Sequence, residues 1–274
     1  MTEDLTIRAS AVIATQVVEE MRTLQHTYPI PTVAVGRTMI GALLMASQLK
    51  QDQEVSLFFQ GNGPLQTIFA EASFEGKTRA YTANPQFQSD IGEKIYVGPA
   101  IGIGLLTVTQ FVPTQTTPQK GTVIIRTGEI GDDIAFYLDQ SFQIPSVVAL
   151  GVQLDVYGKV EAAGGVLIEL MPGADEASIG LIEKRVQAAL PVTQQILSGA
   201  APIDLVKSFL ADFKLIELEH DYPIKYECRC NVERVKRSLT LLGLDEIDEI
   251  LSENKPVEVT CEFCGRKYEV PPAD

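Results

Sequence analysis

The chain has 274 residues, enough for one sizeable domain with one or two small ones beside it. Hydrophobic residues make up 45% of the sequence and its mean hydropathy is +0.10, which excludes an intrinsically disordered protein. The 36 acidic residues outnumber the 22 basic ones and give a net charge of −14, which argues against nucleic-acid binding because that function needs a basic face.

The start of the chain predicts neither export nor membrane insertion. Residues 1–5 carry acids where a signal peptide would carry basic residues and then an apolar run. We find no stretch of eighteen apolar residues, so we expect no contact with a membrane. The expected location is the cytoplasm, a reducing compartment in which thiols bind metals or sense oxidants more often than they form structural disulfides.

Two helices are predicted first. Residues 10–25 have apolar positions at helical spacing, with Ser10 as the N-cap. Residues 32–49 follow, with Pro31 in the first turn and small residues such as Gly36 and Gly41 that permit close approach by a neighbour.

From Glu54 the apolar period changes to two, which predicts an antiparallel meander and further strands. A helix over 131–143 begins with Asp132 and Asp133, acids that the helix dipole favours. Runs of strands with helices at intervals predict an α+β fold, a two-layer, sandwich-like core with mostly antiparallel sheets. The predicted strands are 55–60, 65–72, 78–82, 105–109, 121–126, 147–155 and 159–170.

From Ala174 onward the pattern is helical without strands. The segments 179–190, 192–197 and 202–213 are short and are interrupted by proline and glycine, so each needs a neighbour to stay ordered. We therefore expect three parts, an α+β core, a helical linker that is ordered only conditionally, and a small C-terminal domain. Their expected bounds are 1–175, 176–223 and 224–274.

All four cysteines lie in the C-terminal part, at Cys228, Cys230, Cys261 and Cys264. A C-x-C pair, thirty intervening residues and a C-x-x-C pair can fold back into one tetrahedral four-thiolate site of the kind zinc prefers. Helices are predicted over 232–241 and 244–252, between the two pairs. A module of about fifty residues has a marginal core, so a metal would supply much of its folding energy.

Several functions remain open for this array. Zinc-bound thiolates can also be oxidised, so the site could be a zinc clamp, a dithiol switch or both in turn. A disulfide within the C-x-C pair would close a small, strained ring. A zinc-ribbon adaptor that binds RNA or protein fits the spacing but conflicts with the acidic charge. A thiol oxidoreductase is weaker, because no βαβ pattern surrounds Cys261 and Cys264.

No other segment predicts catalysis. His26 and His220 belong to no metal motif and are each expected to be a solvated or capped histidine, and His220 could bind a metal only if one of the cysteines did not. The glycine-spaced segment 98–104 lacks the spacing and the following helix of a dinucleotide loop and is expected to be a turn. The acidic run 245–249 fits a solvated helix face. We therefore name no catalytic residue and expect the chain not to be an enzyme.

The sequence resembles the family of 33-kilodalton heat-shock chaperones, redox-regulated bacterial holdases. The C-x-C and C-x-x-C pairs carry the resemblance, and phrases of the core add to it. The resemblance covers essentially the whole chain, with Arg229 and the tail after Val270 as ordinary variation. The core phrases occupy residues 59–65, 70–72, 128–130, 140–141, 145–146, 149–152 and 162–165.

The resemblance implies a mechanism. In the reduced state the four thiolates would bind one zinc ion per chain and the protein would be inactive. On oxidation, disulfides Cys228–Cys230 and Cys261–Cys264 would form, zinc would leave, and the C-terminal domain and linker would lose structure. The apolar surface exposed in this way would bind unfolding proteins without ATP, typically in a homodimer.

Overall fold

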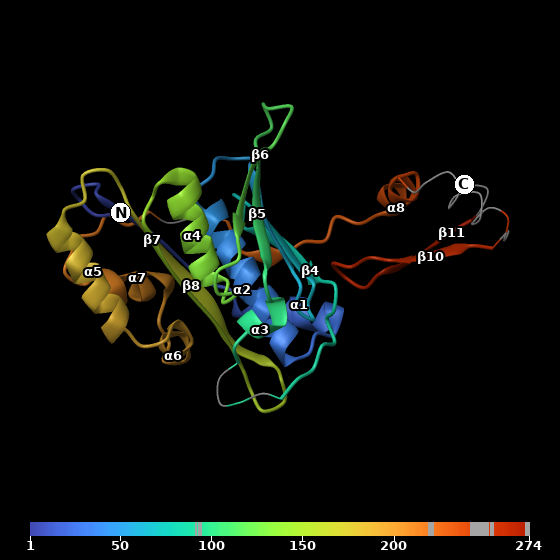
Figure 1. The fold of residues 1–274 in the computed structure, drawn as a ribbon, viewed down its shortest axis with the longest axis horizontal. Helices are drawn as coiled ribbons and strands as arrows, with labels where there is room; N and C mark the ends of the chain where they lie inside the picture. Colours follow the sequence, from blue (N-terminus) through green and yellow to red (C-terminus); the bar gives the residue numbers. More distant parts are fainter. Residues whose placement is uncertain (91, 93–94, 219–221, 242–251, 253–254, 272–274) are drawn as a thin grey trace.

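A computed structural model describes residues 1–90, 92, 95–218, 222–241, 252 and 255–271 (Figure 1). Helices and antiparallel sheets alternate along the chain, which confirms the predicted α+β fold. The elements are β1 (Ile7–Ile13), α1 (Thr15–Gln25), α2 (Pro29–Ala46), β2 (Glu54–Gly61), β3 (Thr67–Ser73), β4 (Lys77–Thr82), α3 (Gly98–Ile101), β5 (Gly104–Phe111), β6 (Gln119–Ile124), α4 (Gly131–Phe142), β7 (Ser146–Leu154), β8 (Val160–Leu170), α5 (Glu176–Ala188), α6 (Val192–Leu197), α7 (Pro202–Leu210), β9 (Lys225–Tyr226), α8 (Val232–Leu239), β10 (Val257–Thr260) and β11 (Lys267–Val270).

The larger sheet has six strands in the order β6-β5-β2-β3-β4-β9. Its central strands β2, β3 and β4 form the predicted antiparallel meander. Side chains alternate between the faces, so Val55, Leu57 and Phe59 of β2 point inward and are buried, whereas Phe58 points to the opposite, outer face. This outer face is the one that meets the C-terminal module.

Helix α2 is the central element of the core. It contacts strands of both the larger sheet and the smaller sheet β1-β8-β7. Its 18 residues are long and apolar enough to cross a membrane, a property that the sequence reading overlooked, but 89% of them are buried inside the protein, as expected of a core helix. Glycine permits its close packing as predicted, since a Cβ on Gly41 would lie 2.3 Å from Ile134 Cδ1.

The predicted helix 10–25 is wrong over its first residues. Strand β1 occupies Ile7–Ile13 and pairs antiparallel with β8, so Ser10 lies within a strand. Helix α1 begins only at Thr15, after an Ala14 N-cap that makes no side-chain hydrogen bond. The run Ala-Val-Ile-Ala fits either period, and pairing with β8 decides between them.

Asp133 corrects a second expectation. It is fully buried, and its Oδ1 accepts hydrogen bonds from the main-chain N–H groups of Arg126 and Thr127, at 2.7 and 3.1 Å. The carboxylate therefore ties the segment after β6 to α4, and the helix dipole is not its main partner. Asp132 lies exposed in the first turn of α4, as predicted.

Helices α5, α6 and α7 belong to a second hydrophobic cluster, formed with one face of the smaller sheet. Glycines let α6 approach this sheet, since a Cβ on Gly151 would lie 2.7 Å from Thr193 Cγ2 and one on Gly164 would lie 2.6 Å from Ile196 Cδ1. These helices lie at one end of the molecule, and α8 with the β10–β11 hairpin lies at the other (Figure 1). Most of the predicted helix 244–252 and the acidic run 245–249 fall outside the described residues.

Candidate metal centre

The first cysteine pair follows a strand that is anchored to the larger sheet. Strand β9 pairs parallel with β4, through bonds from Lys225 N to Gly76 O (3.0 Å) and from Glu227 N to Thr78 O (2.9 Å). Cys228 packs against the main hydrophobic core. Helix α8 begins at Val232, after its N-cap Asn231. The first cysteine pair therefore lies between β9 and α8.

The second cysteine pair lies in the turn between β10 and β11. Gly265 N donates to Cys261 O at 2.8 Å, and Cys261 N donates to Arg266 O at 2.9 Å. Gly265 has φ +67°, a conformation that glycine adopts without strain. This tight turn presents Cys261 and Cys264 on the same side of the hairpin.

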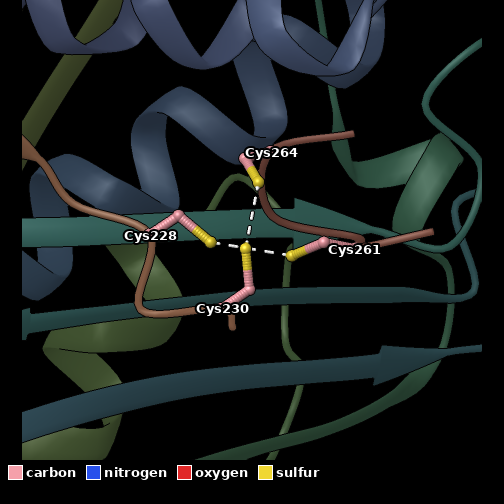
Figure 2. Close-up of side chains that lie close together, drawn as sticks. All are labelled: Cys228, Cys230, Cys261 and Cys264. Carbon is pink, nitrogen blue, oxygen red and sulfur yellow. Dashed lines mark hydrogen bonds between the residues drawn. The ribbon is translucent and has the colours of Figure 1, made fainter. Parts of the chain in front are cut away.

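The four sulfurs converge on one point (Figure 2). All lie within 4.8 Å of one another, with Sγ–Sγ distances of 3.6 Å for Cys228–Cys261 and 3.5 Å for Cys230–Cys264. A disulfide would bring two sulfurs to about 2.05 Å, so the four cysteines are free thiols. Four ligands at about 2.3 Å from a tetrahedral zinc would lie about 3.8 Å apart, which is close to the two Sγ–Sγ distances of 3.6 and 3.5 Å. The cluster can therefore hold a metal ion.

The thiols differ in their electrostatic surroundings. Burial raises the pKa of Cys228 and also that of Cys264. Burial opposes ionisation of Cys230 as well, but hydrogen bonds from Tyr268 and from the other three thiols outweigh it and lower its pKa to about 7. The Tyr268 hydroxyl lies 3.0 Å from Cys230 Sγ. Of these three thiols, Cys230 is thus the one most readily present as thiolate, the form that binds metal.

Residues between the cysteines attach the module to the core. Arg229, inside the C-x-C pair, forms an ion pair with Glu54 on β2. Phe263, inside the C-x-x-C pair, packs edge-on against the rings of Tyr81 and Phe69, at 5.0 and 5.9 Å between centroids. The Arg79 guanidinium lies 4.1 Å from the centre of the Phe263 ring. Arg229, which the sequence comparison passed over as ordinary variation, therefore has a defined partner.

Two polar side chains hold the main chain of Phe263. Its carbonyl accepts hydrogen bonds from the Tyr226 hydroxyl and from Gln25 Nε2, the latter at 3.2 Å. Both donors also bond the carbonyl of Ala80 on β4, and burial raises the pKa of Tyr226, which keeps its hydroxyl protonated. Sequence reasoning missed these contacts because Gln25, Ala80 and Phe263 are far apart in the chain.

The other candidate residues lie apart from any cluster of ligands in the described chain. His26 is exposed at the left-handed C-cap of α1, with its main-chain N–H bonded to Arg22 O. His220 lies outside the described residues. The segment 98–104, predicted as a turn, forms the short helix α3 and then turns at Gly102 with φ +76°.

A family model described as Hsp33 protein matches residues 1–271. The chain belongs to the Hsp33 family. The 33 kDa chaperonin of Enterococcus faecalis is 36% identical over 265 residues, covering 96% of this chain and 88% of that protein. The 33 kDa chaperonin of Aquifex aeolicus is 38% identical over 271 residues, covering 96% and 82%. Membership confirms the resemblance that the cysteine pairs and core phrases indicated.

The fold of this Hsp33 family member also matches a solved structure. The crystal structure of the 33 kDa chaperonin (heat shock protein 33 homolog) from Thermotoga maritima superposes with a TM-score of 0.88 at 32% identity. The match covers 98% of this chain and 92% of that one. The core, the helices α5–α7 and the C-terminal module thus correspond to one known architecture.

Proposed function

We propose that this chain is a redox-regulated, ATP-independent holdase chaperone. It is inactive while reduced and zinc-bound, and when oxidised it binds unfolding proteins and prevents their aggregation during oxidative or heat stress. One observation carries the proposal, namely that four free thiols converge within 4.8 Å in a module whose contacts with the core include residues inside both cysteine pairs.

The proposed ligands of one zinc ion per chain are Cys228, Cys230, Cys261 and Cys264. A structural zinc contributes about 10–16 kcal/mol to the folding of zinc-finger peptides. Among the described residues of 224–274, the buried hydrophobic side chains are Tyr226, Val235 and Val270. So small a core supports the proposal that the metal holds this module together.

Oxidation removes the ligands. With hydrogen peroxide as the oxidant, each cysteine pair gives up two electrons and forms one S–S bond, while the O–O bond of one peroxide breaks and its oxygens leave as water. The proposed disulfides are Cys228–Cys230 and Cys261–Cys264, after which no thiolate remains to retain the zinc. The sulfurs react once per activation, so their role is stoichiometric and the chain is not an enzyme.

Loss of the module then loosens the linker. We propose an α+β core over 1–175, a linker over 176–223 and a redox-switch domain over 224–274. The linker helices α5, α6 and α7 have 13, 6 and 9 residues, at or below the length at which isolated helices are marginal in water. Their buried side chains and the sheet face beneath them would become available to clients, namely Ile182, Val192, Leu205, Val206, Phe209 and Leu210 with Val166 and Ile168.

The proposed partners are unfolded or partly folded proteins and, in the oxidised state, a second copy of this chain. Both associations would use apolar surface uncovered by oxidation. The net charge of −14 disfavours nucleic acid as a partner, and we place the protein in the cytoplasm, where its thiols are reduced until stress occurs.

The test combines three measurements on the full chain. Reduced, zinc-loaded protein is treated with hydrogen peroxide or hypochlorous acid, and zinc release is followed with a chromogenic chelator. The same samples are added to a heat-denatured client without ATP, and light scattering reports aggregation. We expect about one zinc per chain to be released together with the onset of protection. Size-exclusion chromatography reports the dimer.

A quadruple Cys→Ser variant separates the switch from the metal site. It cannot hold zinc through these residues, so its C-terminal module should be unfolded and its chaperone activity constitutive. If the module were unfolded and the variant still failed to protect clients under all conditions, the switch would be wrong. If oxidation released zinc without any protection, the holdase function would be wrong.

A further inference from the structure

A row of aromatic side chains crosses the outer face of the six-stranded sheet. Phe58, Phe69 and Tyr81 are paired in register on the neighbouring strands β2, β3 and β4. Their ring centroids are 6.4 Å apart for Phe58–Phe69 and 5.6 Å apart for Phe69–Tyr81. Since the opposite face of these strands packs on the core, the row is a second, separate apolar surface of the sheet.

Phe263 lies on one end of this row and is held by groups that any peptide could engage. Its ring meets Tyr81 and Phe69 edge-on and lies under the guanidinium of Arg79. Its main-chain carbonyl accepts a hydrogen bond from Gln25 of α1. None of these contacts requires the neighbours of Phe263 in the sequence. They require only an aromatic side chain and a main-chain carbonyl.

Strand β4 offers backbone groups next to the row. On the side away from β3, its partner in the described chain is β9, which is only two residues long and pairs at Lys77–Lys225 and Thr78–Tyr226. Strand β9 leads directly into the first cysteine pair, so release of the module would leave β4 as an edge strand. Such an edge binds an extended segment through main-chain hydrogen bonds, and side-chain sites beside it give selectivity.

We propose that this surface is a client-binding site of the oxidised protein, and that Phe263 occupies in the reduced protein the place of a client's aromatic side chain. The aromatic seat consists of Phe69, Tyr81, Arg79 and Gln25. Its ligand is an extended segment of an unfolding protein that carries a phenylalanine or tyrosine. The inference rests on the proposed holdase function and deepens it, because it names the surface and the chemistry of client recognition.

Fluorescence anisotropy with two labelled peptides tests the seat. The peptides are ten residues long and identical except for a central Phe or Ser, and the protein is the full chain, oxidised and freed of zinc. We expect the Phe peptide to bind at least about tenfold more tightly than the Ser peptide, since the ring contributes both buried area and aromatic pairing. The reduced, zinc-loaded protein should bind both peptides weakly, because Phe263 fills the seat.

Variants locate the binding on the sheet. Tyr81→Thr and Phe69→Thr, each made singly, keep a residue suited to a strand surface. Each should lower the affinity for the Phe peptide about tenfold. The matched control is Ile124→Thr on the outer face of β6, where the side chain is 61% exposed. The affinity of this variant for the Phe peptide should stay within about twofold of that of the unmodified protein. Zinc content and circular dichroism of the reduced variants report folding.

Each outcome decides the proposal. If the unmodified chain binds the two peptides equally, or does not bind the Phe peptide, the proposed aromatic seat is wrong, whatever the variants show. Unchanged affinity in both Tyr81→Thr and Phe69→Thr overturns its location. Light scattering of a client in the same oxidised samples reports the holdase function separately, so protection without peptide selectivity rejects the seat alone. Absence of protection rejects the holdase function itself.

Discussion

The ring of Phe263 packs edge-on against the ring of Tyr81, with 5.0 Å between centroids and 85° between planes. Phe263 stands between Cys261 and Cys264, so the residue that attaches the module to the sheet lies inside a pair of metal ligands. Arg229 stands in the same way between Cys228 and Cys230 and bonds Glu54. A change in the bonding of the sulfurs therefore acts directly on the contacts that keep the module in place.

Replacing Phe263 with alanine should detach the module without emptying the metal site. The change removes the edge-on contacts and the cation–π contact with Arg79, and we expect docking to weaken by about 1–3 kcal/mol. All four sulfurs remain, so the zinc content should stay at its original level. Hydrogen exchange of the Lys225 and Glu227 amides in the reduced protein measures the effect, because these N–H groups donate to the carbonyls of Gly76 and Thr78 and lose these acceptors when the module departs.

The matched control is Glu262→Ala, since Glu262 is an exposed neighbour of Phe263 in the same turn. Its exchange pattern should equal that of the unmodified protein. Increased exchange in both variants would assign the effect to the turn, and unchanged exchange in Phe263→Ala would show that the ring does not hold the module.

Removing zinc from the reduced protein should unfold the C-terminal module and leave the core folded. The core is built around a large buried cluster that contains α2 and strands of the larger sheet, whereas Val235 and Val270 are the buried aliphatic side chains among the described residues of the module. Metal binding worth about 10–16 kcal/mol exceeds what such a core supplies. A chelator titration followed by hydrogen exchange should show loss of protection over 257–270 and retained protection over 29–46.

The site could be predicted further than its surroundings. Each cysteine pair has the short spacing of metal ligands, so the sequence predicts that the four cysteines converge on one site. The structure brings their sulfurs together. Contacts such as Arg229–Glu54 and Phe263–Tyr81 join distant parts of the chain, and no local pattern predicts them. The same reason explains the error at Ser10, where pairing with a strand near the end of the core overrides a local period that suits a helix.

Very short strands escaped the sequence reading as well. Strand β9 has two residues, and β10 and β11 have four each, fewer than the alternation of apolar and polar residues needs to become recognisable. They form because the parallel pairing with β4 and the turn at Gly265 impose extended conformations on them. The longer strands β2 to β8 carry enough periods to be predicted.

Replacing Tyr268 with phenylalanine should weaken zinc binding. Its hydroxyl donates to Cys230 Sγ at 3.0 Å and contributes to the lowered pKa of that thiol. Without the hydrogen bond the pKa of Cys230 rises, so protons compete better with the metal at neutral pH. Loss of such a partner of a metal ligand commonly reduces affinity about 10- to 100-fold, and competition against a chelator of known affinity measures the change.

The pH dependence of this effect has a definite sign. Protons compete with zinc for a thiol below its pKa, so the fold difference in zinc affinity between Tyr268→Phe and the unmodified chain should be largest below about pH 7, the pKa of Cys230. The difference should shrink at higher pH, where both proteins present the thiolate. A difference that grows steadily with pH would contradict the assignment to Tyr268.

The linker should respond to acid through Arg185 and Asp212. The guanidinium of Arg185 on α5 donates two hydrogen bonds, at 2.7 and 2.8 Å, to the Asp212 carboxylate that follows α7, and these lower the pKa of Asp212. Because the folded-state pKa is lowered, the ion pair stabilises above the ordinary carboxyl pKa, and this stabilisation is lost as the pH falls through the lowered value. Amide protection factors of α5 should therefore decrease below about pH 4. Arg185→Gln should show the lower protection already at pH 7, and a pH-independent pattern in the unmodified chain would contradict the role of the pair.

Substitutions at two glycines, one crowded and one with open space around it, should change the stability of the linker helices in opposite directions. Gly151→Val on β7 pushes side-chain atoms into Thr193 of α6, where even a Cβ would lie 2.7 Å from Thr193 Cγ2, and overpacking of this kind costs about 1–3 kcal/mol. Gly180 lies inside α5 with no atom within 4 Å of a Cβ, so Gly180→Ala should stabilise that helix by about 1 kcal/mol.

If release of the linker activates the protein, reduced Gly151→Val should protect a client from aggregation while still holding its zinc. Gly180→Ala should then require more oxidant or a higher temperature for the same protection. Light scattering and zinc content measured on the same samples test this pair. Activation that followed zinc loss alone, and not the stability of the linker helices, would show that the helices do not restrain the chaperone.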